Sequence, residues 1–443
     1  MHKPRFLLLS LSLFLLCATM ALADGAKYVF LLIGDGFGPN QAALTELVAD
    51  RKLAMQRMST HARMGTLNVT SNITDSAASG TAIACGMKTY NGAIGVDKDR
   101  QPVESLAMKL QKQGFKIGLI SSSPLTDATP ATHYAHQEKR SMHREIGHDL
   151  AGSGIAFVGG AGVHDKRTLD DLRESGWNVI GGTNVLAQVR PEGQTFVNSS
   201  PYTAWPNTRP ATPTLAEYLA RAIEVLDNPN GFFIMLENGR IDYAGHDNDA
   251  AMTWREVLAF EEAVEVALAF QARRPDETLV IVTADHETGG LQLEACDKEK
   301  AQLLRGQQSP LSDLGWAMKV LAVKLEGVDA ATARRQRTQS LLAALEQQFG
   351  MTFTAEERAG LEGLFGKALD AGNPTDGLRK AVSQAAIWRD ARVGIRYTTG
   401  GHSAAKVLTH AQGPGAERFV EPLENCDLPR LISQAIQWPG KGE

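Results

Sequence analysis

Acids and histidines in short, mostly glycine-containing segments are the chemically informative residues of this 443-residue chain. The segments are LLIGDGFG, TDATP, LENGRIDYAGH, VTADHETGG and TTGGHS. Their candidate metal ligands are Asp35, Asp127, Thr129, Glu237, Asp242, His246, Asp285, His286 and His402. Ligands in this number can hold more than one divalent ion: imidazole with carboxylate suits zinc, and oxygen ligands alone suit magnesium.

Ser76 is the candidate nucleophile, because a metal can activate a neighbouring hydroxyl. It follows Asp75 in TDSAASGT and begins a predicted helix that ends near Ala84. The free amides at a helix N-terminus also suit a phosphate group. Taken alone, Asp75 or Ser76 is more often a simple helix cap. The metal-ligand candidates elsewhere in the chain favour the nucleophile.

The local context of each candidate ligand admits a structural alternative. Asp242 and His246 are four residues apart, which places both on one face of a helix, but a lone pair at this spacing is usually a surface ion pair. Glu237 ends an apolar run, where an acid without a partner is costly. Asp285 ends another such run, TLVIVTA, whereas a lone loop histidine such as His402 is usually solvated. Only the combined set favours a metal centre.

Arg140 is the candidate anion-binding residue, since the planar guanidinium group binds phosphate through two parallel hydrogen bonds. Most arginines in such a context lie on the surface without a ligand. The other histidines are interpreted as structural or solvated, namely His133, His136, His148 and His164.

Alternating strand and helix patterns must position these side chains. We expect buried strands at Tyr28–Ile33, Lys116–Ser121, Ile155–Gly159, Phe232–Leu236 and Thr278–Thr283. We expect helices at Glu104–Gln113, Thr214–Leu226 and Met252–Ala272. This alternation predicts an α/β fold, a three-layer sandwich whose large central sheet is mainly parallel. Several candidates follow strands directly, at the edge where α/β sheets place their sites.

A helical insertion is expected over about residues 296–391, where the strand pattern disappears. Its predicted helices are Ala331–Phe349, Thr354–Leu369 and Gly377–Arg389, the second beginning with a capping box of Thr354 and Glu357. We interpret residues 24–443 as one catalytic domain that contains this insertion. Residues 182–213, rich in Pro, Asn and Thr, are expected to form a surface loop.

The N-terminus resembles a secretory signal peptide over residues 1–23, with cleavage before Asp24. Lys3 and Arg5 precede an apolar run that is shorter than the ~20 residues needed to span a bilayer. Lipidation at Cys17 is a poorer fit because Leu16 precedes it. The sequence therefore predicts export, to a periplasm or fully secreted, with no membrane anchor after cleavage.

Charge and cysteine content restrict the remaining functions. The formal net charge is −5, and losing Lys3 and Arg5 would make it −7, with no basic run for nucleic acid. Three cysteines would remain, so at most one internal disulfide can form, and its pairing stays open: Cys85, Cys296 and Cys426.

Together these segments resemble the alkaline phosphatase family. DSAASGTAIACGMKTYNGAIGVD is similar to the family's nucleophile segment, and GDG, DATPA, E-x4-D-x3-H, TADH and GGH follow the family's pattern and order over roughly residues 28–420. The resemblance is weakest in 165–215 and 300–390. It implies an α/β sandwich, two Zn²⁺ and one Mg²⁺ per active site, and hydrolysis of phosphate monoesters with broad specificity. It also implies that the chain can form a homodimer.

The resemblance also implies a role for each site residue. Ser76 would be the nucleophile in contact with the first zinc, and Arg140 would bind the phosphate. The first zinc would be held by Asp35, Asp285 and His286. The second zinc would be held by Asp242, His246 and His402. Magnesium would be held by Asp35, Asp127, Thr129 and Glu237.

Two positions vary within the family. Asp127 stands where many members have histidine, which favours an all-oxygen magnesium site. Tyr243 stands where members have lysine, histidine or tryptophan, so the contact that this position makes with phosphate is open.

Two alternative functions are weighed against a monoesterase. A phosphodiesterase or sulfatase of the wider superfamily is one, but sulfatases use C/S-x-P-x-R, and Ala-Ala-Ser-Gly follows Ser76. A non-catalytic protein that binds phosphate or metal is the other. Binding alone would not need a serine beside several metal sites, so the sequence favours the enzyme.

Overall fold

The computed structural model describes residues 25–201, 203, 205, 212–323, 330–371 and 373–436. The predicted signal peptide and its cleavage point before Asp24 lie outside these residues. Among the helices in the described part of the chain, none is long and apolar enough to cross a membrane.

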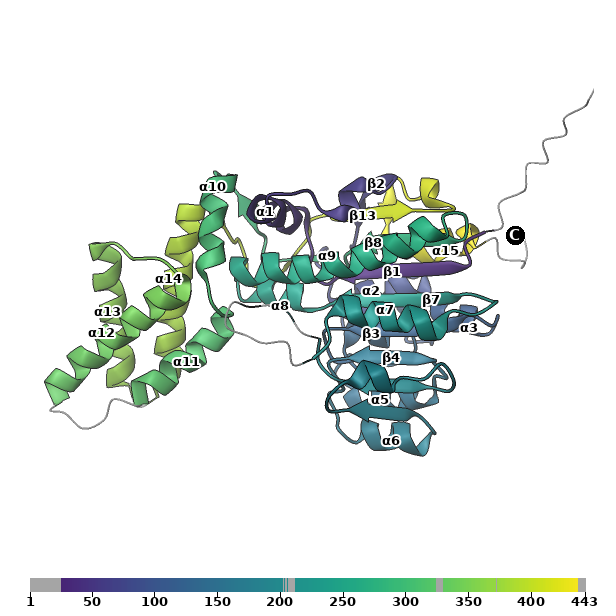
Figure 1. Cartoon of the computed structure of the whole chain (residues 1–443), viewed down its shortest axis with the longest axis horizontal. Helices are drawn as coiled ribbons and strands as arrows, with labels where there is room; N and C mark the ends of the chain where they lie inside the picture. Colours follow the sequence, from purple (N-terminus) through teal and green to yellow (C-terminus); the bar gives the residue numbers. More distant parts are fainter. Residues whose placement is uncertain are drawn as a thin grey trace, which may run out of the picture.

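A ten-stranded sheet forms the centre of the described structure (Figure 1). In spatial order its strands are β14 (Leu423–Glu424), β2 (Thr60–Gly65), β13 (Val407–Gln412), β8 (Thr278–Thr283), β1 (Tyr28–Gly34), β7 (Phe232–Asn238), β3 (Lys116–Ser121), β4 (Phe157–Gly160), β6 (Thr195–Asn198) and β5 (Asn178–Gly181). Neighbouring strands pair in parallel except that β13 is antiparallel to β2 and β8. The predicted mainly parallel sheet is confirmed.

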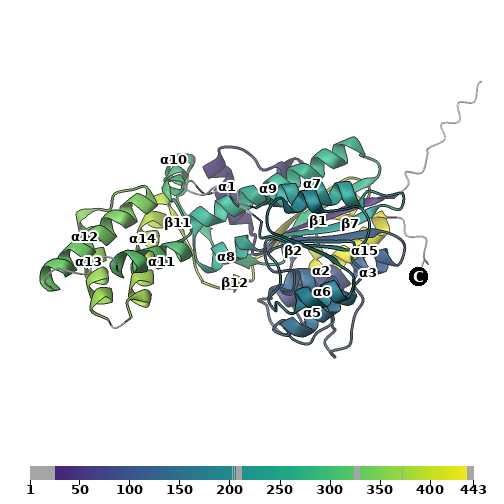
Figure 2. The same ribbon diagram turned by 60° about the horizontal axis from the view of Figure 1, so that its bottom comes forward.

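Helices lie on both faces of the sheet, so the body has three layers (Figure 2). One face is covered by α7 (Leu215–Leu226) and α9 (Ala250–Arg273), and the other by α2 (Ser76–Cys85), α3 (Leu106–Gln111), α5 (His143–Gly152) and α6 (Thr168–Glu174). The other helices of the body are α1 (Pro39–Ala49), α4 (Ala128–Ala131), α8 (Arg240–His246) and α15 (Leu428–Ala435). Because both faces are covered, the central strand β1 reads YVFLLIG and is buried along its whole length.

The helical insertion separates β10 (Gln292–Leu293) from β11 (Ile395–Arg396). Its helices are α10 (Lys298–Ala301), α11 (Leu311–Val323), α12 (Ala330–Phe349), α13 (Ala355–Asp370) and α14 (Thr375–Val393). The last four, called the helical arm below, enclose an apolar core of their own and extend away from the sheet (Figure 1).

Two short antiparallel ribbons lie where the chain leaves and rejoins the body. β10 pairs with β11, and β9 (Glu287–Thr288) pairs with β12 (His402–Ser403). The second ribbon places His402 directly opposite Thr288, although the whole insertion lies between them in sequence. The fold thereby joins two of the sequence motifs.

The expectation of a surface loop over residues 182–213 is wrong in part. Thr195–Asn198 is strand β6, which pairs with both β4 and β5 inside the sheet, and Val185–Gln188 forms a 3-10 helix. A four-residue strand has too few residues to show a periodic pattern, and the polar residues around it dominate the composition. The helix expected at Glu104–Gln113 is shorter, Leu106–Gln111, because Ser105 caps it.

Candidate metal centre and nucleophile

The register of the central strands brings three acids to one edge of the sheet. Ile33 in β1 lies beside both Glu237 in β7 and Thr283 in β8. The three parallel strands therefore end level with one another, and Asp35 and Asp285 follow two of them. Sequence reasoning placed these acids at strand ends, and the register makes them neighbours.

Asp35, Asp285 and His286 form one cluster of possible metal ligands, with their donor atoms within 4.8 Å of one another. His286 Nε2 lies 3.5 Å from Asp35 Oδ1 and 3.3 Å from Asp285 Oδ2. These two carboxylate oxygens are buried and form no hydrogen bond. Two buried acceptors and an imidazole nitrogen that converge in this way suit a cation.

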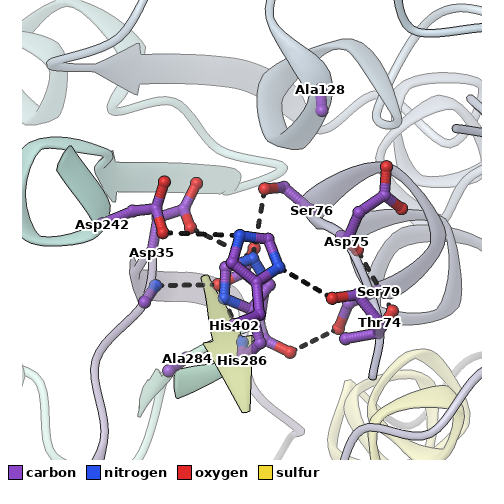
Figure 3. Close-up of polar contacts among 12 residues, drawn as sticks. Asp35, Thr74, Asp75, Ser76, Ser79, Ala128, Asp242, Ala284, His286 and His402 are labelled. Carbon is purple, nitrogen blue, oxygen red and sulfur yellow. Dashed lines mark hydrogen bonds and ion pairs between the residues drawn. The ribbon is translucent and has the colours of Figure 1, made fainter. Parts of the chain in front are cut away.

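Ser76 is at the start of α2, where Asp75 is the N-cap and accepts a hydrogen bond from the Ala78 amide. The Ser76 side chain is buried, and its Oγ lies 3.2 Å from His286 Nε2. Figure 3 shows Ser76 pointing toward the histidine rings, with Asp35 and Asp242 on the side away from Asp75. The hydroxyl thus lies beside the converging ligand atoms. Because Asp75 caps the helix, the Ser76 hydroxyl is not needed as the cap.

A second cluster contains Asp242, His286 and His402, again with donor atoms within 4.8 Å. The expected partner His246 lies one turn after Asp242 in α8, and its Nε2 is 3.3 Å from Asp242 Oδ2. His402 Nε2 is 3.6 Å from Asp242 Oδ1. The predicted trio therefore meets at Asp242, and the ring of His286 stacks on His402 with centroids 3.6 Å apart.

Backbone carbonyls fix the orientation of two of these imidazoles. His246 Nδ1 donates to Gly400 O, and His402 Nδ1 donates to Thr74 O, each at 2.8 Å. Because a carbonyl oxygen only accepts, Nδ1 carries the hydrogen and Nε2 of the neutral ring keeps its lone pair. Nε2 of both rings faces Asp242. A protonated Nε2 can donate to this carboxylate, and an unprotonated Nε2 offers its lone pair to a metal, which is how metal-binding histidines are held.

Glu237 is the centre of a third group, composed of oxygen atoms. Its carboxylate accepts a hydrogen bond from Ser121 Oγ in the neighbouring strand β3. Thr129, Asp35 and Asp127 are all close enough to affect its pKa, and the buried Thr129 hydroxyl has no hydrogen-bond partner. An oxygen-rich group of this kind suits magnesium better than zinc.

Arg140 connects this group to the nucleophile helix. Its guanidinium group lies 3.0 Å from Asp127 Oδ1 and 3.4 Å from Asp75 Oδ2. The side chain is 36% exposed, so one side remains open to solvent or a ligand. Arg140 is therefore accessible beside the two ligand groups, and its predicted contact with phosphate stays a prediction.

Crowded buried carboxylates give the centre its unusual electrostatics. Burial, followed by the charge of Asp242, raises the pKa of Asp285 to about 8, and burial raises the pKa of Glu237 to about 7. Burial, followed by the charge of Asp285, also raises the pKa of Asp35 well above its usual range. In contrast, although burial opposes ionisation, the hydrogen bond with His246 lowers the pKa of Asp242 to about 2. Divalent cations would relieve the repulsion among these acids.

The sequence matches the family model for alkaline phosphatase over residues 26–155 and 195–438. The chain belongs to the alkaline phosphatase family. It is 29% identical to alkaline phosphatase 4 of Bacillus subtilis (strain 168) over 440 residues, which cover 93% of this chain and 89% of the relative. As a member of this family the chain is a phosphate monoester hydrolase.

Solved structures share the fold. The cold-active alkaline phosphatase of a psychrophilic Shewanella species has a TM-score of 0.78 at 24% identity, with 92% of this chain and 99% of that one covered. A histidine-to-aspartate mutant of the alkaline phosphatase from the Antarctic bacterium TAB5, with Mg bound in its M3 site, has a TM-score of 0.65 at 25% identity; 94% of this chain and 99% of that one are covered.

The sequence does not single out two of the residues at the centre. Thr288 Oγ1 donates to Asp242 Oδ1 at 2.5 Å and lies 3.2 Å from His286 Nδ1, so it connects the two clusters. Ser121 is another, because it holds Glu237. Thr288 stands two positions after His286, and that spacing is the one signal the sequence offers. Ser121 ends a strand without any motif.

The structure also places Tyr243, His133 and the cysteines. The Tyr243 hydroxyl lies 3.2 Å from Ser123 Oγ, and burial raises the pKa of this tyrosine to about 12. His133 is buried, and burial lowers its pKa to about 3, which fits a structural histidine. The three described cysteines are free thiols, so no disulfide joins them.

Proposed function

We propose that the chain hydrolyses phosphate monoesters through a metal-dependent phosphoserine mechanism, with Ser76 as the nucleophile. The observation that carries the proposal is the position of the Ser76 hydroxyl, 3.2 Å from His286 Nε2, where the unpartnered oxygens of Asp35 and Asp285 also converge. Binding without turnover would not require a serine at that point.

The donor sets support two zinc ions and one magnesium ion. Asp35, Asp285 and His286 would hold the first zinc, and Asp242, His246 and His402 the second. Asp35, Asp127, Thr129 and Glu237 would hold magnesium. The mixture of imidazole and carboxylate suits zinc, and the oxygen set suits magnesium. The TAB5 mutant, which gained an aspartate and has Mg in its M3 site, agrees with an aspartate at position 127.

The reaction divides into two displacements at phosphorus. Ser76 Oγ loses its proton to solvent and attacks phosphorus, a new Oγ–P bond forms, and the bond to the leaving oxygen breaks. The leaving alkoxide takes up a proton from solvent and departs as the alcohol. Water then attacks the phosphoserine, the Oγ–P bond breaks, and phosphate is released while Ser76 regains a proton. The bound cations supply positive charge that favours the ionised serine and the departing oxygen. Arg140 binds equatorial phosphate oxygens through its open side.

The wider organisation is proposed on the sequence. Residues 1–23 act as a signal peptide, so the mature chain is exported to a periplasm or secreted. Residues 24–443 form one catalytic domain with the helical insertion inside it. The partners are phosphate monoesters of broad structure and a second copy of the chain in a homodimer.

The test is hydrolysis of a chromogenic phosphate monoester at alkaline pH. Purified protein is assayed as prepared, after chelation, and after zinc and magnesium are restored. We expect chelation to abolish activity and the metals to restore it. A matched phosphodiester and a sulfate ester are assayed in parallel, and faster turnover of either would contradict the proposal.

A further inference from the structure

A buried carboxylate lies directly behind the ligand clusters and has no part in the mechanism above. Glu287 stands between His286 and Thr288 in sequence and is only 4% exposed. Burying an acid is costly unless its oxygens are fully hydrogen-bonded. The burial of the Glu287 carboxylate therefore needs a structural explanation.

The ribbon of β9 and β12 separates Glu287 from the ligand clusters. Thr288 opposes His402, and Glu287 opposes Ser403. Because successive side chains on a strand point to opposite faces, one face of the ribbon carries His402 and Thr288 toward Asp242, and the other carries Glu287 and Ser403. Fixing the second face thus fixes the first.

Four donors satisfy the Glu287 carboxylate. Oε2 accepts from the Ser403 hydroxyl and from the Gly290 amide at 3.2 Å. Oε1 accepts from Gln41 Nε2 at 2.7 Å and from the Leu291 amide at 3.3 Å. Hydrogen bonds to a buried charged group contribute more than neutral ones. The donors come from helix α1, strand β12 and the turn after β9, so Glu287 ties three parts of the chain together.

Gln41 reinforces this arrangement from α1. Its Nε2 donates to Glu287 Oε1 and also to the Thr288 backbone carbonyl at 2.9 Å. A Cβ on Gly38, just before α1, would overlap the Glu287 side chain, so the helix approaches closely. The close approach leaves little freedom for the ribbon to move away from α1.

We propose that Glu287 is a positioning residue for the zinc ligands, holding the ribbon so that His286 and His402 keep their stacked orientation. The inference rests on the proposed metal centre and extends it to a residue that touches neither substrate nor metal. Partners that orient metal ligands typically change metal affinity about 10- to 100-fold when they are removed. Glu287 acts through backbone geometry, since its side chain faces away from the ligands.

The experiment measures zinc affinity of the metal-free full chain by competition with a chromophoric chelator, which needs no turnover. We expect Glu287→Ala to weaken zinc binding about 10- to 100-fold. Glu287→Gln keeps the size and an acceptor oxygen, so it should recover most of the affinity. Ser403→Ala removes one of the four donors and should give a smaller loss in the same direction, which keeps the test decisive if Glu287→Ala folds poorly.

Glu261→Ala is the matched control. Glu261 is also buried, and it accepts hydrogen bonds from the Ala54 amide and from Arg51, away from the ligands. We expect it to lower thermal stability without changing zinc affinity. The proposed role of Glu287 would be overturned if zinc affinity were unchanged in both Glu287→Ala and Ser403→Ala. It would also be overturned if Glu261→Ala weakened zinc binding as much as Glu287→Ala does. Neither result would refute the metal centre. Wild-type protein that bound no zinc would refute the proposed centre itself.

Discussion

The carboxyl edge of the sheet and the helical arm are built on opposite principles. The arm encloses apolar side chains such as Leu314, Leu345 and Phe365, and ion pairs such as Arg334 with Asp370 lie at its surface. The sheet edge instead buries several carboxylates whose pKa values are raised by burial and by one another. The arm is packed as an ordinary apolar core, whereas the edge holds carboxylates whose mutual repulsion is relieved by protonation or by bound cations.

The two regions meet in a buried polar network at the root of the arm. Asp249 caps α9, just after the ligand helix α8, and accepts hydrogen bonds from Gln307 Nε2 at 3.0 and 3.1 Å. Gln307 Oε1 in turn accepts from Arg389 in α14, which also pairs with Asp390. A substitution in this network would show whether a change in the arm alters the ligand clusters at the sheet edge.

The largest effect is expected from Asp35→Ala at the sheet edge. Asp35 belongs to one ligand cluster and interacts with Glu237 of the oxygen group, so its loss affects both. Monoester hydrolysis should fall by at least about 100-fold, more than for a residue that only orients a ligand. The control is Asp313→Ala, an exposed acid of the arm, which should hydrolyse at the wild-type rate.

Leu345→Ala in the core of the arm should produce the complementary result. Leu345 is fully buried, and removing such a side chain costs about 2–5 kcal/mol of unfolding free energy. Urea denaturation followed by circular dichroism would measure the loss. The folded variant should keep its kcat and zinc affinity, and a fall in zinc affinity like that of Asp35→Ala would contradict the energetic separation of the two regions.

Gln307→Ala tests the junction and should have a smaller effect. It leaves Asp249 and Arg389 buried with fewer partners, at a cost of about 1–3 kcal/mol. Because Asp249 follows α8, we also expect KM to rise while the affinity of the Asp35 cluster for zinc stays the same. Stability and kinetics identical to wild type would show that the network does not join the regions.

The last expected effect is a difference in pH dependence between metal-free and metal-loaded protein. Folding raises the pKa of Glu237 to about 7 and that of Asp285 to about 8, above ordinary values near 4. Their contribution to stability is full below pH 4 and is lost as pH rises through 7 and 8. The melting temperature of metal-free protein should therefore fall from pH 5 to 8. Bound metals should remove most of this fall. The account would be contradicted if the difference in melting temperature between metal-loaded and metal-free protein narrowed as pH rises.

The sequence predicts those parts of the molecule in which one local pattern decides the structure. Long apolar runs such as Thr278–Thr283 identify the central strands, and the motif around Asp285 predicts candidate ligands at their ends. The short strand β6 was missed because four residues carry no clear periodicity. Amino-acid composition does not reveal the neighbouring strands with which such a short strand pairs.

Contacts between distant segments are the part that the sequence cannot supply. Asn425 Nδ2 donates to Ser79 Oγ in the nucleophile helix at 2.9 Å, across 346 positions of sequence. Glu287 is a similar case, since its importance depends on Gln41 and Ser403 reaching it from elsewhere. Glu287 and Ser403 each follow a candidate ligand in sequence, but nothing in the sequence shows that they contact each other or Gln41.

The most direct test of the central claim is to trap the covalent intermediate. Metal-loaded protein is mixed with a phosphate monoester, quenched in acid, and digested for mass spectrometry, with Ser76→Ala and Ser312→Ala of the arm treated in the same way. The account predicts phosphate on Ser76 in the wild type and in Ser312→Ala, and neither label nor appreciable hydrolysis in Ser76→Ala. Hydrolysis by Ser76→Ala at the wild-type rate, or phosphate on another residue, would contradict it.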